Sequence, residues 1–316
     1  LTNLFSQLME AISNRDTLNF NEVFIDGTKF EAYANKYTFI WKGSIQKRLA
    51  KLSDKFAVLK HDVWIQLGLE TAAMSDELVY TYLANEIEHT GTKLVQGKGT
   101  RKTPLQRLYE RAEEIYEKRK EYEMHLSIMG ERNSYSKTDH DATFMRMKDD
   151  HMRNGQLKPA YNIQLAVHSE YIMGIGVFPN PNDTNTLIPF IQQLEQLHSQ
   201  RFKYIVADAG YDSQENFTWL ADNGYWSCIK PRDYEKAKTR AWVKDIGKAR
   251  NMQYIPSLDM FICAKGRELH YTGTRKGKTK TGFISERKVY TCKSCNHCGL
   301  RKECQPYAKI RNASNP

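Results

Sequence analysis

The sequence contains no long apolar run. Its 316 residues include no segment that approaches the roughly 18 consecutive apolar residues of a membrane-spanning helix. The N-terminus also lacks a basic segment followed by an apolar one, which is the pattern of a secretory leader. These two absences predict a cytoplasmic protein without a membrane partner.

Cysteine is scarce outside one short segment. The chain has six cysteines, which are too few and too clustered for a secreted disulfide framework. Four of them are spaced Cys-x₂-Cys-x₂-Cys-x₅-Cys: Cys292, Cys295, Cys298 and Cys304. This spacing is typical of ligands of a structural Zn²⁺ ion, with His297 as a spare, and iron–sulfur ligation stays open as an alternative. The remaining two, Cys228 and Cys263, are expected to be buried apolar side chains.

Acidic residues are fewer than basic ones. The chain has 47 Lys and Arg against 37 Asp and Glu, a formal net charge of +10 and a pI near 9.1. A surplus of this size favours a polyanionic partner, and nucleic acid is the first candidate, although a basic protein without such a partner is the alternative. The hydrophobic content of 40% suffices for a core. The first residue is Leu1 rather than Met, which we interpret as the mark of a fragment or a processed product.

Two apolar runs stop at an aspartate with a glycine close behind. One run ends at Asp26, before Gly27, and the other ends at Asp208, before Gly210. Each run predicts a strand buried on both faces, whose terminal carboxylate lies at the edge of an open α/β sheet. On neighbouring strands, about 4.8 Å apart, two such carboxylates can share a Mg²⁺ ion, and the glycines let the chain turn away. Taken singly, each aspartate is better explained as a turn or helix cap, and it is the repetition of the pattern in a basic chain that favours a metal site.

The remaining periodicity predicts a mixed sheet with a helical insertion. Helical spacing covers residues 4–12, 45–67, a segment capped by Ser75, 104–129, a segment opened by Thr186, and a segment opened by a capping box at 212–215. Strands are predicted at 160–168 and 171–178, which form a hairpin, and at 226–230. This order fits a five-stranded mixed sheet in a domain of residues 1–231, interrupted by helices at 41–130. Residues 232–316, with short strands at 260–263, 268–271 and 289–292, are expected to form a small β-rich insertion that carries the cysteines.

Four longer segments resemble those of bacterial insertion-sequence transposases of the DDE type. They are FIDGTKFEAYANKY (24–37), SKTDHDATFMRMK (136–148), LKPAYNIQ (157–164) and VADAGYDS (206–213). The resemblance implies a ribonuclease H-like catalytic domain that nicks and rejoins transposon ends by Mg²⁺-dependent phosphoryl transfer, with Mn²⁺ as a substitute. Asp26 and Asp208 match the first and second catalytic aspartates of the family. The implied partners are double-stranded DNA, as transposon ends and target, and a second copy of the chain, in a nucleoid-associated bacterial protein.

The third catalytic residue of the family, a glutamate on a helix beyond the β-rich insertion, has no counterpart here. None of the nearby glutamates after Asp208 lies in a suitable predicted helix, and Glu215 is expected to be a capping residue. We therefore expect a truncated chain with little or no activity of its own. The alternatives are a non-catalytic DNA-binding remnant of a transposase and a related metal-dependent nuclease.

The remaining candidates are basic residues and scattered acids. Two clusters are candidate DNA contacts, although the second is equally well explained as a solvated turn: Lys137, Arg146 and Lys148, and Arg275, Lys276, Lys278 and Lys280. The acid–histidine clusters at 139–141 and 149–151 are expected to be solvated loops. Asp183 is a candidate fourth acid of the site, but we favour a role in the turn before Thr186.

Overall fold

The computed structural model describes residues 2–97, 101–147, 155–295 and 298–306. Three of the predicted features lie outside the described residues: Lys148, the acid–histidine cluster at 149–151, and His297. The chain divides into two compact units. The first contains Leu1–Asp26, Leu165–Ile175 and Asp183–Pro316, and the second contains Gly27–Gln164 and Gly176–Asn182. Among the described helices, none is long and apolar enough to cross a membrane.

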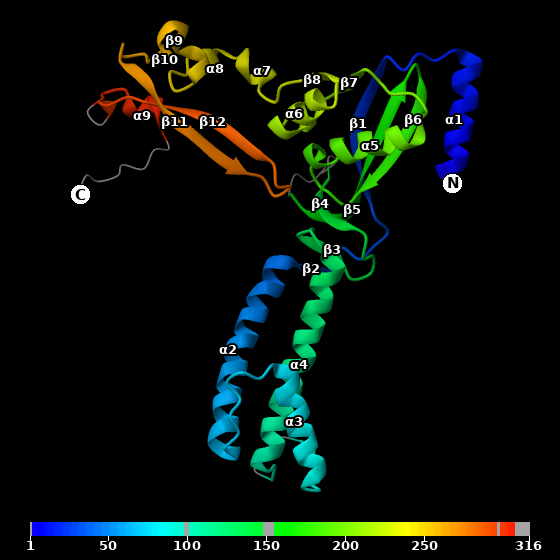
Figure 1. Ribbon diagram of the computed structural model, residues 1–316, viewed down its shortest axis with the longest axis vertical. Coiled ribbons are helices and arrows are strands. Elements are labelled where there is room, and N and C mark those ends of the chain that lie inside the picture. The colour runs from blue at the N-terminus through cyan, green and yellow to red at the C-terminus, as the bar shows by residue number, and fades with distance from the viewer. Residues whose placement is uncertain (1, 98–100, 148–154, 296–297, 307–316) are drawn as a thin grey trace. The chain divides into compact units, whose positions relative to one another are not determined.

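The main sheet is mixed and has six strands rather than the expected five (Figure 1). Its strands are β1 (Glu22–Glu31), β4 (Thr143–Arg146), β5 (Leu157–His168), β6 (Tyr171–Phe178), β7 (Tyr204–Ala207) and β8 (Trp226–Ile229). The order is β4-β5-β1-β7-β8, and β6 also pairs with β5. Strands β1, β7 and β8 are parallel, whereas β4 is antiparallel to β5. The additional strand, β4, is only four residues long, so its sequence carries too little alternation to identify it.

The β5–β6 connection confirms the predicted tight hairpin. Only Ser169 and Glu170 separate the strands, and both have positive φ angles, of 48° and 71°. Two positive φ angles define the turn that matches the twist of antiparallel strands. The chain adopts this conformation without a glycine at either position.

The longer helices of the first unit, which also contains β7 and β8, are α1 (Thr2–Asp16), α5 (Leu187–Leu197) and α6 (Gln214–Asp222). Helix α5 buries Leu187, Phe190, Ile191 and Leu194, the apolar face predicted from the sequence. The predicted capping box of α6 is wrong. The N-cap is Ser213, whose hydroxyl accepts a hydrogen bond from the Asn216 amide at 3.1 Å. Ser213 is preferred because its extended backbone places the hydroxyl over the first turn of the helix.

The second unit contains three long helices, which lie side by side in Figure 1: α2 (Lys42–Leu67), α3 (Asp76–His89) and α4 (Pro104–Met129). Their predicted starts are confirmed at Ser75, which caps α3, and at Pro104, which begins α4 behind its N-cap Thr103. The shared core is aliphatic, with Leu59, Val63 and Leu83 fully buried. A short antiparallel pair, β2 (Phe39–Trp41) and β3 (Ser134–Ser136), joins the segments that enter and leave these helices.

A second, four-stranded sheet in the order β12-β11-β10-β9 occupies the C-terminal part. Its strands are β9 (Gln253–Ile255), β10 (Met260–Ile262), β11 (Glu268–Lys278) and β12 (Ile284–Thr291). The same part of the chain contains short helical turns: α7 (Tyr234–Ala237), α8 (Arg240–Val243), η3 (Ala249–Asn251), η4 (Pro256–Leu258) and α9 (Arg301–Cys304). The expected short strands at 268–271 and 289–292 are in fact parts of β11 and β12, a long hairpin. Arg275 and Lys276 therefore lie in a strand rather than in a turn.

Asp259 ties this second sheet together. Its carboxylate accepts hydrogen bonds from the hydroxyls of Tyr254 and Tyr290, both at 2.6 Å, and from the Lys288 ammonium at 3.2 Å. These hydrogen bonds lower the pKa of Asp259 to about 2. Asp259 therefore stays ionised and keeps its three partners through the neutral range.

Candidate active site

Asp26 and Asp208 are neighbours where the pairing between β1 and β7 ends. The last paired residues of the two parallel strands are Ile25 and Ala207, so the two aspartates occupy the next position on each strand. The prediction that Asp26 ends its strand is wrong, because β1 continues to Glu31. Gly27 accordingly lies within β1 and does not turn the chain away. The register still brings together the two residues that the sequence singled out.

Both aspartates also lie on the same face of the sheet. Ile25 and Ala207 are buried, and successive side chains of a strand point to opposite faces, so Asp26 and Asp208 share the exposed face. Phe24 lies on that face of β1 and is 53% exposed, so the expectation of a strand buried on both faces is also wrong. The exposed face leaves room beside the carboxylates for a substrate.

Asp183 is a third carboxylate at this position. It belongs to the turn η1 (Asp183–Asn185), and Asp208 caps the turn η2 (Ala209–Tyr211) by accepting a hydrogen bond from the Gly210 amide at 2.8 Å. A Cβ atom on Gly210 would lie 2.9 Å from Oδ1 of Asp208 and 3.1 Å from Oδ2 of Asp183. The two carboxylate oxygens are therefore no more than about 6 Å apart.

The backbone of Asp183 plays the role that the sequence favoured. Its carbonyl accepts hydrogen bonds from the amide of Thr186 at 3.0 Å and from the Thr186 hydroxyl at 2.8 Å, which orders the turn before α5. The main chain of Asp183 thus forms the turn while its side chain lies beside Asp208. The two roles that we considered as alternatives are compatible.

Asn216, which the sequence did not single out, holds the two turns together. Its buried side-chain amide donates hydrogen bonds to the carbonyls of Thr184, at 3.0 Å, and Tyr211, at 2.8 Å. One side chain therefore connects η1 with η2 and sets the spacing between Asp183 and Asp208. A lone asparagine in the first turn of a helix carries no sequence signal for this role.

The described glutamates after Asp208 have other roles. Glu215 accepts a hydrogen bond from the Thr281 hydroxyl at 2.8 Å, which corrects the expectation that it is a capping residue. Glu235 pairs with Lys230, Glu268 with His270, and Glu286 with Lys276. Glu303 lies in the four-residue helix α9. Among the described residues that follow Asp208, no glutamate lies on a helix longer than α6.

The oxygen-rich side chains fit a hard divalent cation. Mg²⁺ prefers carboxylate and water oxygens and commonly takes only one or two carboxylates from the protein. Three carboxylates from β1, η1 and the end of β7 supply such donors. In the described ranges, no group of three or more His, Cys, Asp or Glu side chains is arranged so that it could hold a metal ion.

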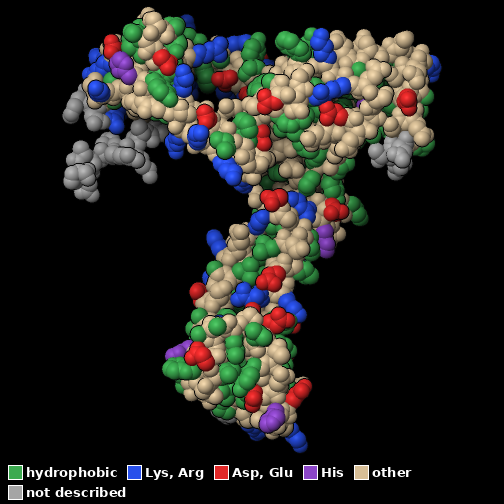
Figure 2. All heavy atoms as spheres, viewed as in Figure 1, with side chains coloured by type: hydrophobic (Ala, Val, Ile, Leu, Met, Phe, Trp, Pro, Cys, Tyr) green, Lys and Arg blue, Asp and Glu red, His purple; other side chains and the backbone are tan. Residues whose placement is uncertain are grey.

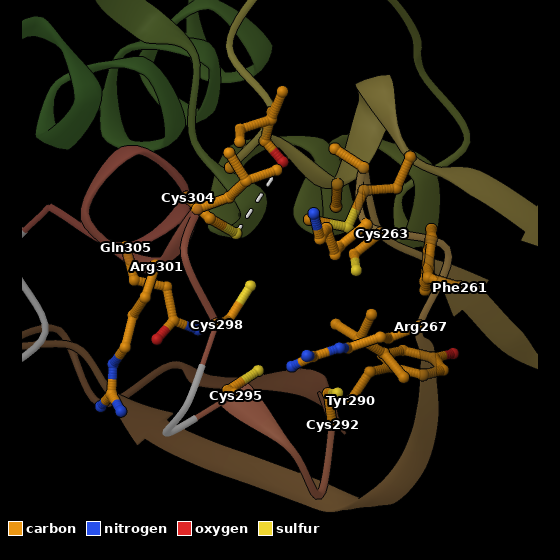
Figure 3. Close-up of a pocket in the computed structure, with 18 of the residues that line it drawn as sticks. Phe261, Cys263, Arg267, Tyr290, Cys292, Cys295, Cys298, Arg301, Cys304 and Gln305 are labelled. Atoms are coloured by element: carbon orange, nitrogen blue, oxygen red, sulfur yellow. Dashed lines mark hydrogen bonds between the residues drawn. The ribbon is translucent and has the colours of Figure 1, made fainter.

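The described cysteines of the predicted cluster line one pocket, shown in Figure 3, with a volume of about 290 Å³. Burial raises the pKa of the Cys295 and Cys304 thiols. Hydrogen bonds from the backbone and hydroxyl of Ser294 lower the pKa of Cys292. Cys263, which we expected to be a buried apolar residue, is only partly buried and lines the same pocket. Cys228 is exposed on β8, against the same expectation.

The candidate DNA contacts fall into two groups. Lys137 and Arg146 are exposed residues of the second unit, and the Arg146 guanidinium lies against the backbone of Gly155. The other four are exposed residues of β11 and the turn that follows it, where Lys276 pairs with Glu286 at 2.9 Å. Figure 2 shows Lys and Arg side chains along this hairpin.

One cross-strand pair in the hairpin brings like charges together. Arg275 and Arg287 are directly opposite in the β11–β12 register, and neither forms a salt bridge with a carboxylate among the described residues. Two guanidinium groups at such a position repel each other. A polyanion would relieve this repulsion.

A comparison with protein families identifies the chain. The family model described as "Transposase DDE domain" matches residues 132–298, more than half of the sequence. The chain belongs to the transposase DDE domain family. The matched range includes Asp183, Asp208 and four of the five cysteines that line the pocket, and Asp26 precedes it. Neither the curated proteins nor the solved structures provide a match.

Membership accounts for the general features of the molecule. DDE transposases act on DNA and generally use a divalent metal ion such as Mg²⁺, which agrees with a chain of net charge +10 that carries neighbouring carboxylates. The mixed α/β sheet is compatible with the ribonuclease H-like domain of such enzymes.

Proposed function

We propose that this DDE transposase domain nicks and rejoins DNA at transposon ends, and that Asp26 and Asp208 hold the catalytic Mg²⁺. The observation that carries the proposal is the β1–β7 register, because it places both aspartates side by side on one exposed face. Family membership supplies the reaction class. We further propose that residues 1–231 form a catalytic domain with an insertion at 41–130. Residues 232–316 then form a β-rich insertion.

In this proposal the chain's own residues bind the metal ions and orient the carboxylates that hold them. Divalent metal ions, when bound, activate the attacking oxygen and stabilise the leaving oxygen of an in-line phosphoryl transfer. Asp26, within β1, and Asp208, directly after β7, offer carboxylate oxygens, and the Gly210 amide fixes one oxygen of Asp208. Asn216 holds the turn that carries Asp208 against the turn that carries Asp183.

Asp183 is proposed as a supporting carboxylate of the same site. Its oxygen and that of Asp208 approach the same point above Gly210. A second anion at this distance raises the local negative charge and so favours a divalent cation. This role differs from that of the family's third catalytic residue, which is a glutamate on a helix.

The glutamates that follow Asp208 support an impaired activity for the 316-residue chain. Glu235, Glu268 and Glu286 are engaged in ion pairs with basic neighbours. We therefore propose metal binding and DNA binding with little strand cleavage. A non-catalytic DNA-binding remnant is the second candidate function, and the same observation favours it.

The proposed DNA contacts are Lys137 and Arg146 in one unit and Arg275, Lys278 and Lys280 in the other. Support comes from their exposure and from the like-charge pair of Arg275 and Arg287. The family resemblance further suggests a homodimer on paired ends in the bacterial cytoplasm, associated with the nucleoid. Light scattering with and without duplex DNA tests the dimer.

Titration calorimetry with Mn²⁺ and Mg²⁺ tests the carboxylate site. We expect Asp26→Asn and Asp208→Asn each to weaken Mn²⁺ binding at least tenfold. The matched control is Asp222→Asn, because Asp222 is an exposed aspartate at the end of α6. Unchanged affinity in both site variants would refute the shared metal site.

A cleavage assay separates the two candidate functions. The substrate is a duplex that carries the ends of the element encoding the chain, incubated with Mg²⁺. Cleavage that Asp208→Asn abolishes would contradict the proposed impairment. Metal-independent binding of the same duplex without cleavage supports the DNA-binding remnant, whereas plain hydrolysis without strand joining supports a nuclease.

A further inference from the structure

Cys263 lies in a tight turn that directs it toward the cysteine cluster. It directly follows β10, its amide donates to the Arg267 carbonyl at 2.9 Å, and its carbonyl accepts from the Gly266 amide at 2.8 Å. Gly266 has a φ of +73°, which a side chain would disfavour. A short hairpin turn with a cysteine at its start and a glycine at its end is well suited to present a thiol.

Figure 3 shows the Cys263 sulfur pointing into the pocket, which Cys295, Cys298 and Cys304 enter from the opposite side. All four of these cysteines line the same pocket. They come from a strand end, a turn and a helical turn that are separate in the sequence. The fold thus gathers in one pocket thiols from segments that are far apart in the sequence.

Cys292 differs from the other thiols of the pocket. Its sulfur lies 3.6 Å from the Ser294 hydroxyl, and its interactions with other cysteines are with Cys295. The Arg267 side chain also lies beside it, and donates to the Ser294 carbonyl. The Ser294 hydroxyl and the Arg267 side chain therefore lie beside Cys292, in addition to the Cys295 thiol.

We propose that Cys263, Cys295, Cys298 and Cys304 bind a structural Zn²⁺ ion, and that Cys292 is not a ligand. Four thiolates in tetrahedral geometry are a common structural zinc site. The set retains three of the four cysteines that the spacing suggested, and replaces Cys292 with a residue from a different strand. This proposal is independent of the carboxylate site, because thiolates select zinc whereas Mg²⁺ selects oxygen.

The surroundings of the pocket fit the charge of such a site. A divalent ion with four thiolates carries a net charge of −2, which nearby cations must offset. Lys265, Arg267 and Arg301 line the pocket. Their positive charges would offset part of this negative charge.

Packing also controls the position of Cys304. Its thiol donates to the Ile246 carbonyl at 4.0 Å, and a Cβ atom on the adjacent Gly247 would lie 2.3 Å from the Cys304 carbonyl oxygen. The backbone of the last helical turn therefore approaches residues 246 and 247 closely. Among the described residues, no three thiols are yet arranged around a metal position. Zinc binding would therefore draw the four sulfur atoms closer together and connect the turn after β10 to α9.

Zinc content and metal affinity of the 316-residue chain test the proposal. We expect about one Zn²⁺ per chain with a sulfur-only ligand shell at about 2.3 Å by X-ray absorption. Cys263→Ser should weaken zinc affinity at least about tenfold, a loss expected even for residues that merely support a ligand. Cys292→Ser should retain the metal, and Cys228→Ser, at an exposed position on β8, is the matched control.

A conservative variant guards against simple misfolding. Cys263→His keeps a zinc-binding side chain and should restore tetrahedral Co²⁺ absorption, which Cys263→Ser should lack. Full zinc content in Cys263→Ser with loss in Cys292→Ser would overturn the proposed ligand set in favour of the four-cysteine spacing. A coloured protein that contains iron and sulfide, or a folded protein without bound metal, would overturn the zinc site altogether.

Discussion

Gly210 controls how closely two carboxylates approach at the candidate site. The sequence suggested that glycines after the aspartates serve to turn the chain, but Gly210 does not have a positive φ angle. Its importance is space, because the oxygens of Asp208 and Asp183 both lie beside its missing side chain. Such a requirement comes from a tertiary approach between two loops, so the local sequence could not reveal it.

Replacing Gly210 by alanine should weaken metal binding. The added Cβ would lie 2.9 Å from Oδ1 of Asp208 and 3.1 Å from Oδ2 of Asp183, so one carboxylate must move. We expect about a tenfold loss of Mn²⁺ affinity, equivalent to about 1.4 kcal/mol, by titration calorimetry. Gly43→Ala is the control, since nothing lies within 4 Å of that position in α2. Equal Mn²⁺ affinity in the two variants would contradict the role of Gly210.

His198 should make stability depend on pH. Its ring lies near Phe20 and Phe202, and its Nε2 donates to the Met173 carbonyl at 2.7 Å. Burial lowers the pKa of His198 below 6.5, so the unfolded chain binds its proton more readily than the folded chain. The folded state should therefore lose stability as the pH falls below about 6.5.

Urea unfolding at pH 7.5 and pH 5.5 measures this dependence. In His198→Gln the difference in unfolding free energy between the two pH values should shrink relative to the wild type. The control is His61→Gln, because His61 is an exposed histidine of α2 in the other unit. An unchanged pH dependence in His198→Gln would show that other groups are responsible.

At the scale of elements, helices were predictable where a few neighbouring residues define the start of the helix or its apolar face. The apolar stripe of α2, the cap Ser75 of α3 and the proline that begins α4 are each encoded within a few residues. Strand ends were less predictable. An aspartate followed by glycine indicates a turn, yet β1 continues to Glu31, since pairing partners and not local propensity determine where a strand stops.

The β11–β12 hairpin should show opposite effects on stability and DNA binding. Arg287 is directly opposite Arg275, so Arg287→Ala removes a repulsion and should leave folding stability equal or raised by up to about 1 kcal/mol. The same change should weaken duplex binding, since it removes a positive charge directly opposite the proposed DNA contact Arg275. Lys276→Ala is the contrast, because it removes the salt bridge with Glu286 and should not raise stability.

Thermal unfolding and fluorescence anisotropy with a labelled duplex measure the two quantities. A fall in both stability and affinity for Arg287→Ala would indicate that Arg287 supports the hairpin and has no special role toward DNA. Unchanged affinity with raised stability would exclude the hairpin from the interface.

At the scale of the whole molecule, the sequence predicted the class of partner better than the residues that meet in space. Net charge is a sum over the chain, so +10 could be read directly. The meeting of Asp183 with Asp208, and of Cys263 with Cys304, depends on the topology of sheets and turns, which no periodicity encodes. The motifs shared with transposases singled out Asp26 and Asp208, and the β1–β7 register brings these two residues together.

Salt dependence should reveal how the two basic groups share DNA binding. For duplex DNA the logarithm of the binding constant falls with the logarithm of salt concentration, with a slope of about −0.9 for each neutralised phosphate. We expect the triple variant Arg275→Ala, Lys278→Ala, Lys280→Ala to reduce the magnitude of this slope by up to about 2.7, and Lys137→Ala with Arg146→Ala by up to about 1.8. If both groups contact one duplex, the combined variant should show the sum of the two reductions. If only one group contacts DNA, the slope of the combined variant should equal that of the more affected of the other two variants. Slopes identical to the wild type in all three variants would exclude both groups from the interface.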